Sequence, residues 1–250
     1  METRTAFSSF PKRRAPLPPE FAAIYSEHYK ANRSGESKAS SLAQRMERWM
    51  HKKVAEDVRF GPPKATLEVG AGTLNHLPYE KGTTPYDVVE PFGSLYEGSA
   101  SIKQIRTIYQ DIAEISCSTK YDRIISIATF EHICNLPEVI AQSALLLNSE
   151  GQLRVAIPSE GTLLWRLGWK LTTGLEFKLR HHLDYEVLMK YEHVNTAREI
   201  EDTLRYFFGR VETKTFGLVR SLSFYQFFAC SEPHLDKCNH HSSELSIADC

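Results

Sequence analysis

The sequence lacks the long apolar runs and the charge excess that mark several classes of protein. No stretch approaches the roughly 18 consecutive apolar residues of a membrane-spanning helix. The basic residues Lys12, Arg13 and Arg14 are not followed by an apolar segment, so the pattern is not that of a secretory signal. The 30 lysines and arginines are balanced by 31 aspartates and glutamates, which gives a net charge of −1. A general nucleic-acid binder needs a strong positive excess, so this balance argues against nucleic acid as a partner.

Cysteine is also scarce, and its spacing is not that of a disulfide or zinc framework. The five cysteines are Cys117, Cys134, Cys230, Cys238 and Cys250. An odd number without paired spacing favours reduced thiols, which are typical of cytoplasmic proteins. We therefore expect a soluble cytoplasmic protein, and we predict no metal site.

The composition that remains is that of a globular domain. Hydrophobic residues make up 42% of the 250 residues and charged residues 24%, both ordinary values for a soluble fold. This length predicts one large domain, or one domain with an appendage, and a substantial core.

The stretch that organises the chain is residues 66–77, TLEVGAGTLNHL. It predicts a short apolar strand, a glycine turn and then a helix whose free backbone N–H groups face a ligand. Gly70 and Gly72 allow a tight turn and a close approach of the ligand to the backbone. Glu68 would repel a pyrophosphate but would suit the cationic amino group of an amino-acid-bearing ligand. An ordinary strand-to-helix turn is the alternative interpretation.

Two further acids follow predicted strands. Residues 86–90 predict a second strand that ends in Glu90. This acid lies about 20 residues beyond the glycines, where a doubly wound sheet places a carboxylate on ribose hydroxyls. Residues 106–109 predict a short third strand, which Asp111 follows. The spacing of Glu90 also suits a nicotinamide cofactor, and Asp111 by itself is equally typical of a loop cap.

The glycine stretch resembles the first motif of class I S-adenosylmethionine-dependent methyltransferases, Glu/Asp-x-Gly-x-Gly-x-Gly. The third glycine of that motif falls at Leu74, so we expect the loop or its packing to differ there. The resemblance covers roughly residues 65–230 and implies S-adenosylmethionine as the cofactor, with Asp111 accepting from the adenine amino group. It assigns cofactor binding to Glu68, Gly70, Gly72, Glu90, Asp111, Ile112 and Thr129.

Residues 121–129 give the clearest buried strand, and Phe-Glu-His-Ile follows at once at 130–133. This segment is similar to the fourth-strand motif of small-molecule methyltransferases. Because the carboxyl end of the strand is expected over the cofactor crevice, His132 is the predicted general base for an acceptor hydroxyl. Glu131 either orients this histidine or faces away. The alternative is that His132 lines the cofactor or caps the next helix.

Strands and helices alternate along the rest of the chain. We predict helices over 138–147 and 197–208 and strands over 152–157, 210–219 and 223–230. The predicted fold class is α/β: a Rossmann-like doubly wound seven-stranded sheet, mostly parallel with an antiparallel C-terminal strand, plus N-terminal helices and a helical insertion.

The predicted divisions of the chain follow from these elements. They are an extended arm over 1–19, a helical cap over 20–60, a methyltransferase domain over 61–231 with an insertion at 161–192, and a flexible tail over 232–250. The cap is expected to lie over the cofactor end of the sheet.

Substrate contacts are predicted outside the glycine motif. Tyr25 in the cap and His193 after the insertion are the candidates, with half-buried packing as the alternative for Tyr25. The insertion is interpreted as a substrate lid, as a packed helical hairpin, or as a segment whose residues 161–183 touch a membrane surface.

The sequence therefore predicts a methyltransferase that uses S-adenosylmethionine and acts on a small-molecule acceptor. A sugar or glycan precursor with a hydroxyl or amino group is the expected acceptor, from the resemblance alone. The alternatives are a protein or nucleic-acid methyltransferase, a non-catalytic cofactor-binding or scaffolding protein with the same fold, and a nicotinamide-dependent oxidoreductase. The oligomeric state is left open.

Overall fold

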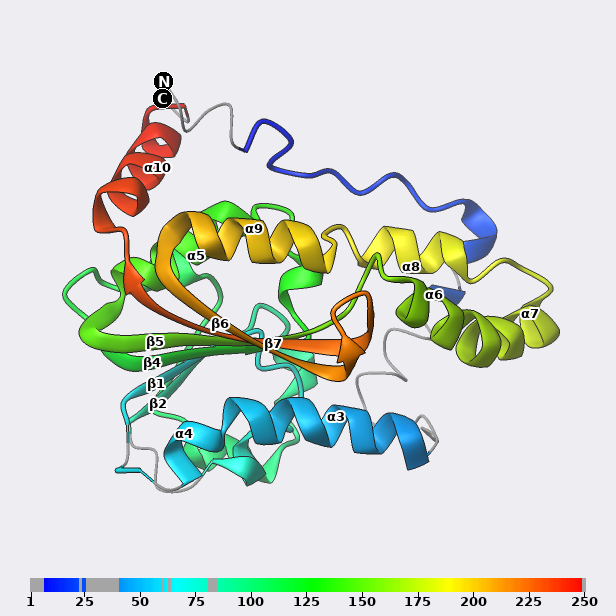
Figure 1. Cartoon of the computed structure of the whole chain (residues 1–250), viewed down its shortest axis with the longest axis horizontal. Helices are drawn as coiled ribbons and strands as arrows, with labels where there is room; N and C mark the ends of the chain where they lie inside the picture. The colour runs from blue at the N-terminus through cyan, green and yellow to red at the C-terminus, as the bar shows by residue number, and fades with distance from the viewer. Residues whose placement is uncertain are drawn as a thin grey trace.

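A seven-stranded sheet forms the centre of the protein, as the sequence predicts (Figure 1). The computed structural model describes residues 7–22, 24–25, 41–59, 61–62, 64–80 and 85–248. The strand order is β3-β2-β1-β4-β5-β7-β6, in which β1 to β5 pair in parallel and β7 pairs antiparallel with both β5 and β6. The strands are β1 (Thr66–Val69), β2 (Tyr86–Val89), β3 (Thr107–Tyr109), β4 (Tyr121–Ile127), β5 (Leu147–Pro158), β6 (Phe208–Val219) and β7 (Leu222–Pro233).

Helices cover both faces of the sheet, which explains why the central strands are apolar runs. On one face lie α5 (Leu136–Leu145), α9 (Ala197–Phe207) and α10 (Leu235–Ala248), and on the other α3 (Ser41–Val54) and α4 (Glu56–Arg59) (Figure 1). Successive side chains of a strand point to opposite faces. Leu67 accordingly packs in the core cluster that contains the buried residues of α5 and α9, whereas Val88 packs in the cluster that contains Met50 and Val54 of α3.

The cap helix that precedes the glycine loop is shorter than predicted. The sequence predicts one helix to about residue 60, but α3 ends at Val54 and the short α4 follows it. α3 packs against β4, β5 and β7, and its Glu47 also accepts from Nδ2 of Asn75 in the glycine loop at 3.2 Å. Two buried arginines of the sheet, Arg123 and Arg154, both donate to the carbonyl oxygen of Val54, at 2.9 Å each. These bonds use a carbonyl at the end of the helix that has no partner within it, and they fix α3 along a sheet face.

The helix expected after the glycine turn is absent from the described residues. A 3-10 helix, Leu77–Tyr79, stands in its place before β2. Pro78 lies in the first turn of this 3-10 helix and lacks a backbone N–H. The described segment between the glycine turn and Glu80 is also too short for a longer helix.

The predicted flexible tail is wrong for residues 232–248. Strand β7 extends to Pro233, and α10 follows it and packs against α5 and α9. Cys238 is fully buried there, and the ring of His241 meets those of Phe7 and Phe207 at centroid distances of 5.6 Å. The polar composition of this segment suggested a flexible tail, but a few of its side chains, among them Cys238 and His241, pack against the core.

The 161–192 insertion forms helices at the end of the sheet where β5 ends (Figure 1). They are α6 (Leu163–Trp169), a π-helical turn (Lys170–Gly174), α7 (Leu175–His181) and α8 (Glu186–Glu192). Phe177 and Leu188 are buried together, as a packed hairpin requires. A stripe of leucines nevertheless stays exposed: Leu163, Leu167, Leu171, Leu175 and Leu179. The lid and the membrane-surface contact therefore both remain predictions. No helix among the described residues is long and apolar enough to cross a membrane.

Candidate functional site

The loop after β1 holds the two predicted glycines in conformations that favour glycine. Gly70 has φ +77° and Gly72 φ +52°. A Cβ on Gly70 would stand 2.2 Å from Cγ2 of Thr129, so the loop lies directly against the segment after β4. Thr129 also donates from its hydroxyl to the carbonyl oxygen of Gly70 at 3.2 Å. Two predicted cofactor segments are thus brought together by the side chain of Thr129, which lies against the backbone of Gly70.

Leu74 shows how the loop departs from the family pattern. Its φ of 63° lies in the left-handed region, which is strained for a residue with a branched side chain. The side chain is only 1% exposed and packs in the core cluster that contains Met50 and Val54 of α3. The position therefore keeps a glycine-like backbone while its side chain contributes to the core.

Glu90 connects the first two loops at the carboxyl ends of β1 and β2. Its Oε2 accepts from the backbone N–H of Gly72 at 2.7 Å, and its Oε1 accepts from the backbone N–H of Phe92 at 3.1 Å. Each carboxylate oxygen retains a second lone pair. The predicted ribose-binding acid therefore lies directly beside the glycine loop.

Glu68 lies beneath the loop rather than at its surface. It is 2% exposed, and its Oε2 accepts from the hydroxyl of Tyr86 at 2.7 Å. Burial raises the pKa of this carboxyl to about 8, because the charged form is poorly solvated there. The group is thus mainly protonated at neutral pH, whereas the sequence interpretation required a carboxylate.

Asp111 and Ile112 follow β3, at the same edge of the sheet. Asp111 is exposed, and its side chain accepts from the backbone N–H of Ala113 at 2.9 Å, which makes it a cap of a 3-10 helix. Ile112 is buried in the core cluster that lies against α5 and α9. The cap that the sequence allowed as an alternative for Asp111 is present, and a role in adenine binding remains a prediction.

His132 and His193 are brought together, although they are distant in the sequence. Their rings meet edge to face with centroids 4.9 Å apart. Nδ1 of His132 lies 3.0 Å from the carbonyl oxygen of Glu192, and Nδ1 of His193 lies 2.8 Å from Oε2 of Glu160. The predicted base and one predicted substrate contact thus form a single group beyond the end of β4.

Charge and burial act in opposite directions at this group. Burial alone would lower the pKa of His193, but the hydrogen bond to Glu160 and the charges of nearby glutamates hold it above its usual value. Burial raises the pKa of Glu131 to about 7. Burial alone would raise the pKa of Glu160, but the hydrogen bond to His193 holds that pKa below its usual value.

Tyr25, the other predicted substrate contact, packs against the helices of the insertion. Its ring meets that of Tyr191 of α8 edge to face at 5.2 Å, and it is half-buried against the cluster that contains Phe177. Three further cap residues that the sequence raised, His28, Tyr29 and Arg33, lie outside the described residues.

Sequence analysis missed two parts of the site. The N-terminal arm crosses it: Lys12 donates from Nζ to the carbonyl oxygen of Val194 at 2.8 Å, and Arg14 donates from Nη2 to that of His132 at 2.7 Å. Nothing in the proline-rich arm predicts these partners. Glu160, which also accepts from Nε1 of Trp165 at 2.6 Å, follows the end of β5. Its place at the carboxyl end of a parallel strand could have marked it as a candidate site residue, because ligands bind at that edge of such a sheet.

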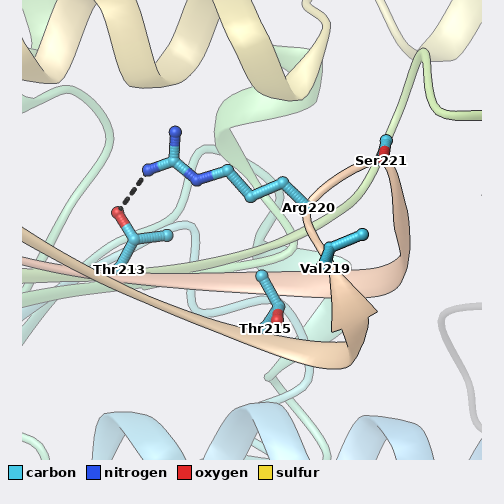
Figure 2. Close-up of a pocket in the computed structure, with 5 residues that line it drawn as sticks. All are labelled: Thr213, Thr215, Val219, Arg220 and Ser221. Atoms are coloured by element: carbon cyan, nitrogen blue, oxygen red, sulfur yellow. Dashed lines mark hydrogen bonds between the residues drawn. The ribbon is translucent and has the colours of Figure 1, made fainter.

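A surface hollow lies elsewhere and does not belong to this site. Figure 2 shows its lining residues, Thr213, Thr215, Val219, Arg220 and Ser221, at the β6–β7 hairpin. In the strand order, β6 is the edge strand and is separated from β1 by β7, β5 and β4. The chemistry-bearing residues are gathered at the glycine loop and the histidine pair instead.

No protein-family model and no curated protein matches this sequence. Solved structures share its fold. The N-methyltransferase NodS from Bradyrhizobium japonicum WM9, in complex with S-adenosyl-l-homocysteine, is similar with a TM-score of 0.54 at 12% identity, over 79% of this chain and 90% of that chain.

Two further structures are similar to the same degree. The 1,6-didemethyltoxoflavin-N1-methyltransferase of Burkholderia thailandensis has a TM-score of 0.56 at 15% identity, over 88% of this chain and 93% of that one. The plantazolicin methyltransferase BpumL has a TM-score of 0.56 at 14% identity, over 85% and 92%. Identities this low establish the fold alone, and that fold is the one of the class I S-adenosylmethionine-dependent methyltransferases.

Proposed function

We propose that this chain is an S-adenosylmethionine-dependent methyltransferase that acts on a small molecule. The observation that carries the proposal is the contact between Glu90 and the glycine loop. It sets a carboxylate with spare acceptor capacity beside a backbone turn, as recognition of a ribose diol at such a loop requires. The similar structures of NodS and BpumL contain S-adenosylhomocysteine, which supports the same cofactor class here.

The loop residues fit this ligand. Among the described residues, nothing lies within 4 Å of the position that a Cβ on Gly72 would take, so the loop leaves room for a ligand on that side. S-adenosylmethionine, when bound, supplies a methyl group that its positive sulfur already activates. The protein then chiefly positions and desolvates the reactants. In this proposal Glu90 binds the ribose, Asp111 and Ile112 border the adenine, and Gly70, Gly72 and Thr129 shape the cradle with Glu68 beneath it.

His132 is the proposed proton acceptor when no metal ion is bound. A carbonyl oxygen only accepts hydrogen bonds, so the Nδ1 that faces Glu192 carries the proton in the neutral ring. Nε2 is then the ring nitrogen that would accept a proton from an acceptor hydroxyl. Tyr25 and His193 are the proposed substrate contacts in this region.

The acceptor class rests on the sequence pattern. We propose a hydroxyl or amino group of a sugar or glycan precursor. The similar enzymes named above were crystallised with a monoazolic desmethylPZN analog in one case and with 1,6-didemethyltoxoflavin in another, so the fold accommodates varied acceptors.

Transfer of labelled methyl groups tests the activity. The protein is incubated with methyl-labelled S-adenosylmethionine and a panel of sugar nucleotides, amino sugars, peptides and RNA. We expect label on a sugar-class acceptor, and His132→Gln should lower turnover while it leaves S-adenosylhomocysteine affinity unchanged. Label on peptide or RNA would refute the acceptor class. Binding of the cofactor without transfer to any acceptor would favour the non-catalytic alternative, and reduction of NAD would favour an oxidoreductase.

A further inference from the structure

Three side chains beyond the end of β4 form a cluster of metal-ligating groups. Glu131, His132 and His193 each offer one ligand atom, and these atoms all lie within 4.8 Å of one another. Nε2 of His132 is 3.8 Å from Oε1 of Glu131. Tetrahedral ligands about 2.1 Å from an ion are about 3.4 Å apart. Side-chain adjustments of about an ångström are therefore enough to close the set around one ion.

Both histidines have the outer hydrogen bond that metal-binding histidines use. A ligating histidine typically donates its other ring N–H to a carbonyl or carboxylate oxygen, which fixes the tautomer and the ring orientation. Here Nδ1 of His132 faces the carbonyl oxygen of Glu192, and Nδ1 of His193 faces the carboxylate of Glu160. Because Nδ1 of each ring faces such an oxygen, Nε2 is the nitrogen through which each ring would bind a metal ion.

Glu131 supplies an independent sign of a missing partner. The side chain is 1% exposed, and its Oε2 is buried without a hydrogen-bond partner among the described residues. A buried carboxylate oxygen without a partner costs free energy unless a cation or donor satisfies it. A metal ion between this carboxylate and the two Nε2 atoms would satisfy it.

The segments that carry the three residues are tied to each other, so the cluster is held by its scaffold. The carbonyl oxygen of Glu131 accepts from the backbone N–H groups of Val194 and Asn195, at 2.8 and 3.1 Å. Asn195 donates from Nδ2 to the carbonyl oxygens of Phe130 and Ile133, at 2.8 and 2.7 Å. Residues on either side of each ligand are thereby fixed, as a preorganised site requires.

We propose that Glu131, His132 and His193 bind one divalent first-row transition-metal ion, for which Zn²⁺ is the reference. Two imidazoles and one carboxylate are a ligand set that such ions accept with positions left open. The sequence predicted no metal site, because its ligands come from two segments that only the fold brings together.

The role of the ion deepens the proposed function and rests on it. An ion at this place would hold an acceptor oxygen in one of its open positions and lower the pKa of that hydroxyl. The hydroxyl proton would pass to solvent, and His132, with its lone pair on the metal, would then be a ligand rather than the base.

Metal binding is measured on the full chain without any methyl acceptor. The protein is stripped with a chelator and titrated with Zn²⁺ by calorimetry, and Co²⁺ is added separately for its visible absorption. We expect one ion per chain. His132→Ala, His193→Ala and Glu131→Gln should each weaken binding at least about 100-fold. Glu160→Gln, which removes none of the three ligands but alters the outer hydrogen bond of His193 and the bond from Trp165, should weaken it by about 10-fold.

His240→Ala is the matched control, because His240 is an exposed histidine on α10. It should bind Zn²⁺ as the unchanged protein does. Binding that is lost in His240→Ala but kept in His132→Ala would overturn the proposal, and so would a protein that binds no Zn²⁺. Melting temperatures without metal and S-adenosylhomocysteine affinities show that the variants are folded. They also separate the two claims: Zn²⁺ binding without S-adenosylhomocysteine binding removes the proposed function and leaves the metal site.

Discussion

Gly70 and Thr129 are in such close contact that a single added methyl group cannot fit between them. A Cβ on Gly70 would meet Cγ2, Oγ1 and Cβ of Thr129 at 2.2, 2.4 and 2.8 Å. The loop after β1 is therefore shaped by the segment after β4, and not by its glycines alone. This contact holds the glycine loop against the segment that leads to His132.

Gly70→Ala should destabilise the protein by about 2 to 5 kcal/mol, since it adds both a clash and a positive-φ strain. Combining Gly70→Ala with Thr129→Gly should recover the part of the lost stability that is due to the clash, while the part due to the positive-φ strain remains. Urea unfolding of the two variants measures this. Gly98→Ala is the control, because no atom of the described part of the chain lies within 4 Å of the Cβ that it adds, and its stability should stay within about 0.5 kcal/mol of that of the unchanged protein. Equal stability of Gly70→Ala and Gly98→Ala would contradict the observed contact.

Glu68 should make the stability of the protein fall as pH rises. Its pKa is raised from 4.5 to about 8 in the folded state. Below the lower value both states are protonated, so the residue contributes no pH dependence. Between the two values only the unfolded state ionises, and stability falls by roughly 1.4 kcal/mol per pH unit.

Glu68→Gln removes this dependence and keeps an acceptor for the hydroxyl of Tyr86. The stability of the variant relative to the unchanged protein should rise steadily between about pH 5 and pH 8, as measured by denaturant unfolding at several pH values. Glu97, beyond β2, is exposed. The stability of Glu97→Gln should therefore vary with pH in the same way as that of the unchanged protein. A parallel curve for Glu68→Gln as well would show that Glu68 is not the buried acid described here.

The strands were predictable from the sequence because each carries its own signal. Apolar runs such as residues 121–127 have to be covered on both faces, which fixes a parallel sheet with helices on either side. Thr196 was predictable in the same way as a helix cap, and it forms a capping box with Glu199. Local chemistry thus determined the element types and most of their order.

What could not be predicted depends on contacts between distant segments. The bonds from Lys12 to Val194 and from Arg14 to His132 have no local pattern. The helix predicted over 197–208 ends at Phe207, but β6 begins at Phe208, before the predicted strand start at residue 210, because β6 pairs with β7 from Phe208 onward. Tertiary pairing outweighed the local preference there.

Cys238 should be protected from alkylation, in contrast to a cysteine in a flexible tail. It is buried on α10, and burial raises the pKa of its thiol to about 12, whereas Cys117 is exposed. We expect Cys238 to react with iodoacetamide at least about 100-fold more slowly than Cys117, because the thiolate is the reacting form. Mass spectrometry of the labelled peptides gives both rates in one sample. Equal alkylation rates for Cys238 and Cys117 would contradict the packed α10 and support a flexible tail at residues 232–248.

The most direct test of the central claim is calorimetry of S-adenosylhomocysteine binding to the unchanged protein and to Glu90→Gln, with NAD as the ligand control. Glu90→Gln keeps an oxygen for the N–H of Gly72 but replaces one of the two acceptors offered to a ribose diol. We expect micromolar binding of S-adenosylhomocysteine and none of NAD, with affinity at least about 10-fold weaker in Glu90→Gln and unchanged in Glu97→Gln. No binding of S-adenosylhomocysteine by the folded protein would mean that the glycine loop is only a turn, and it would contradict the proposed function.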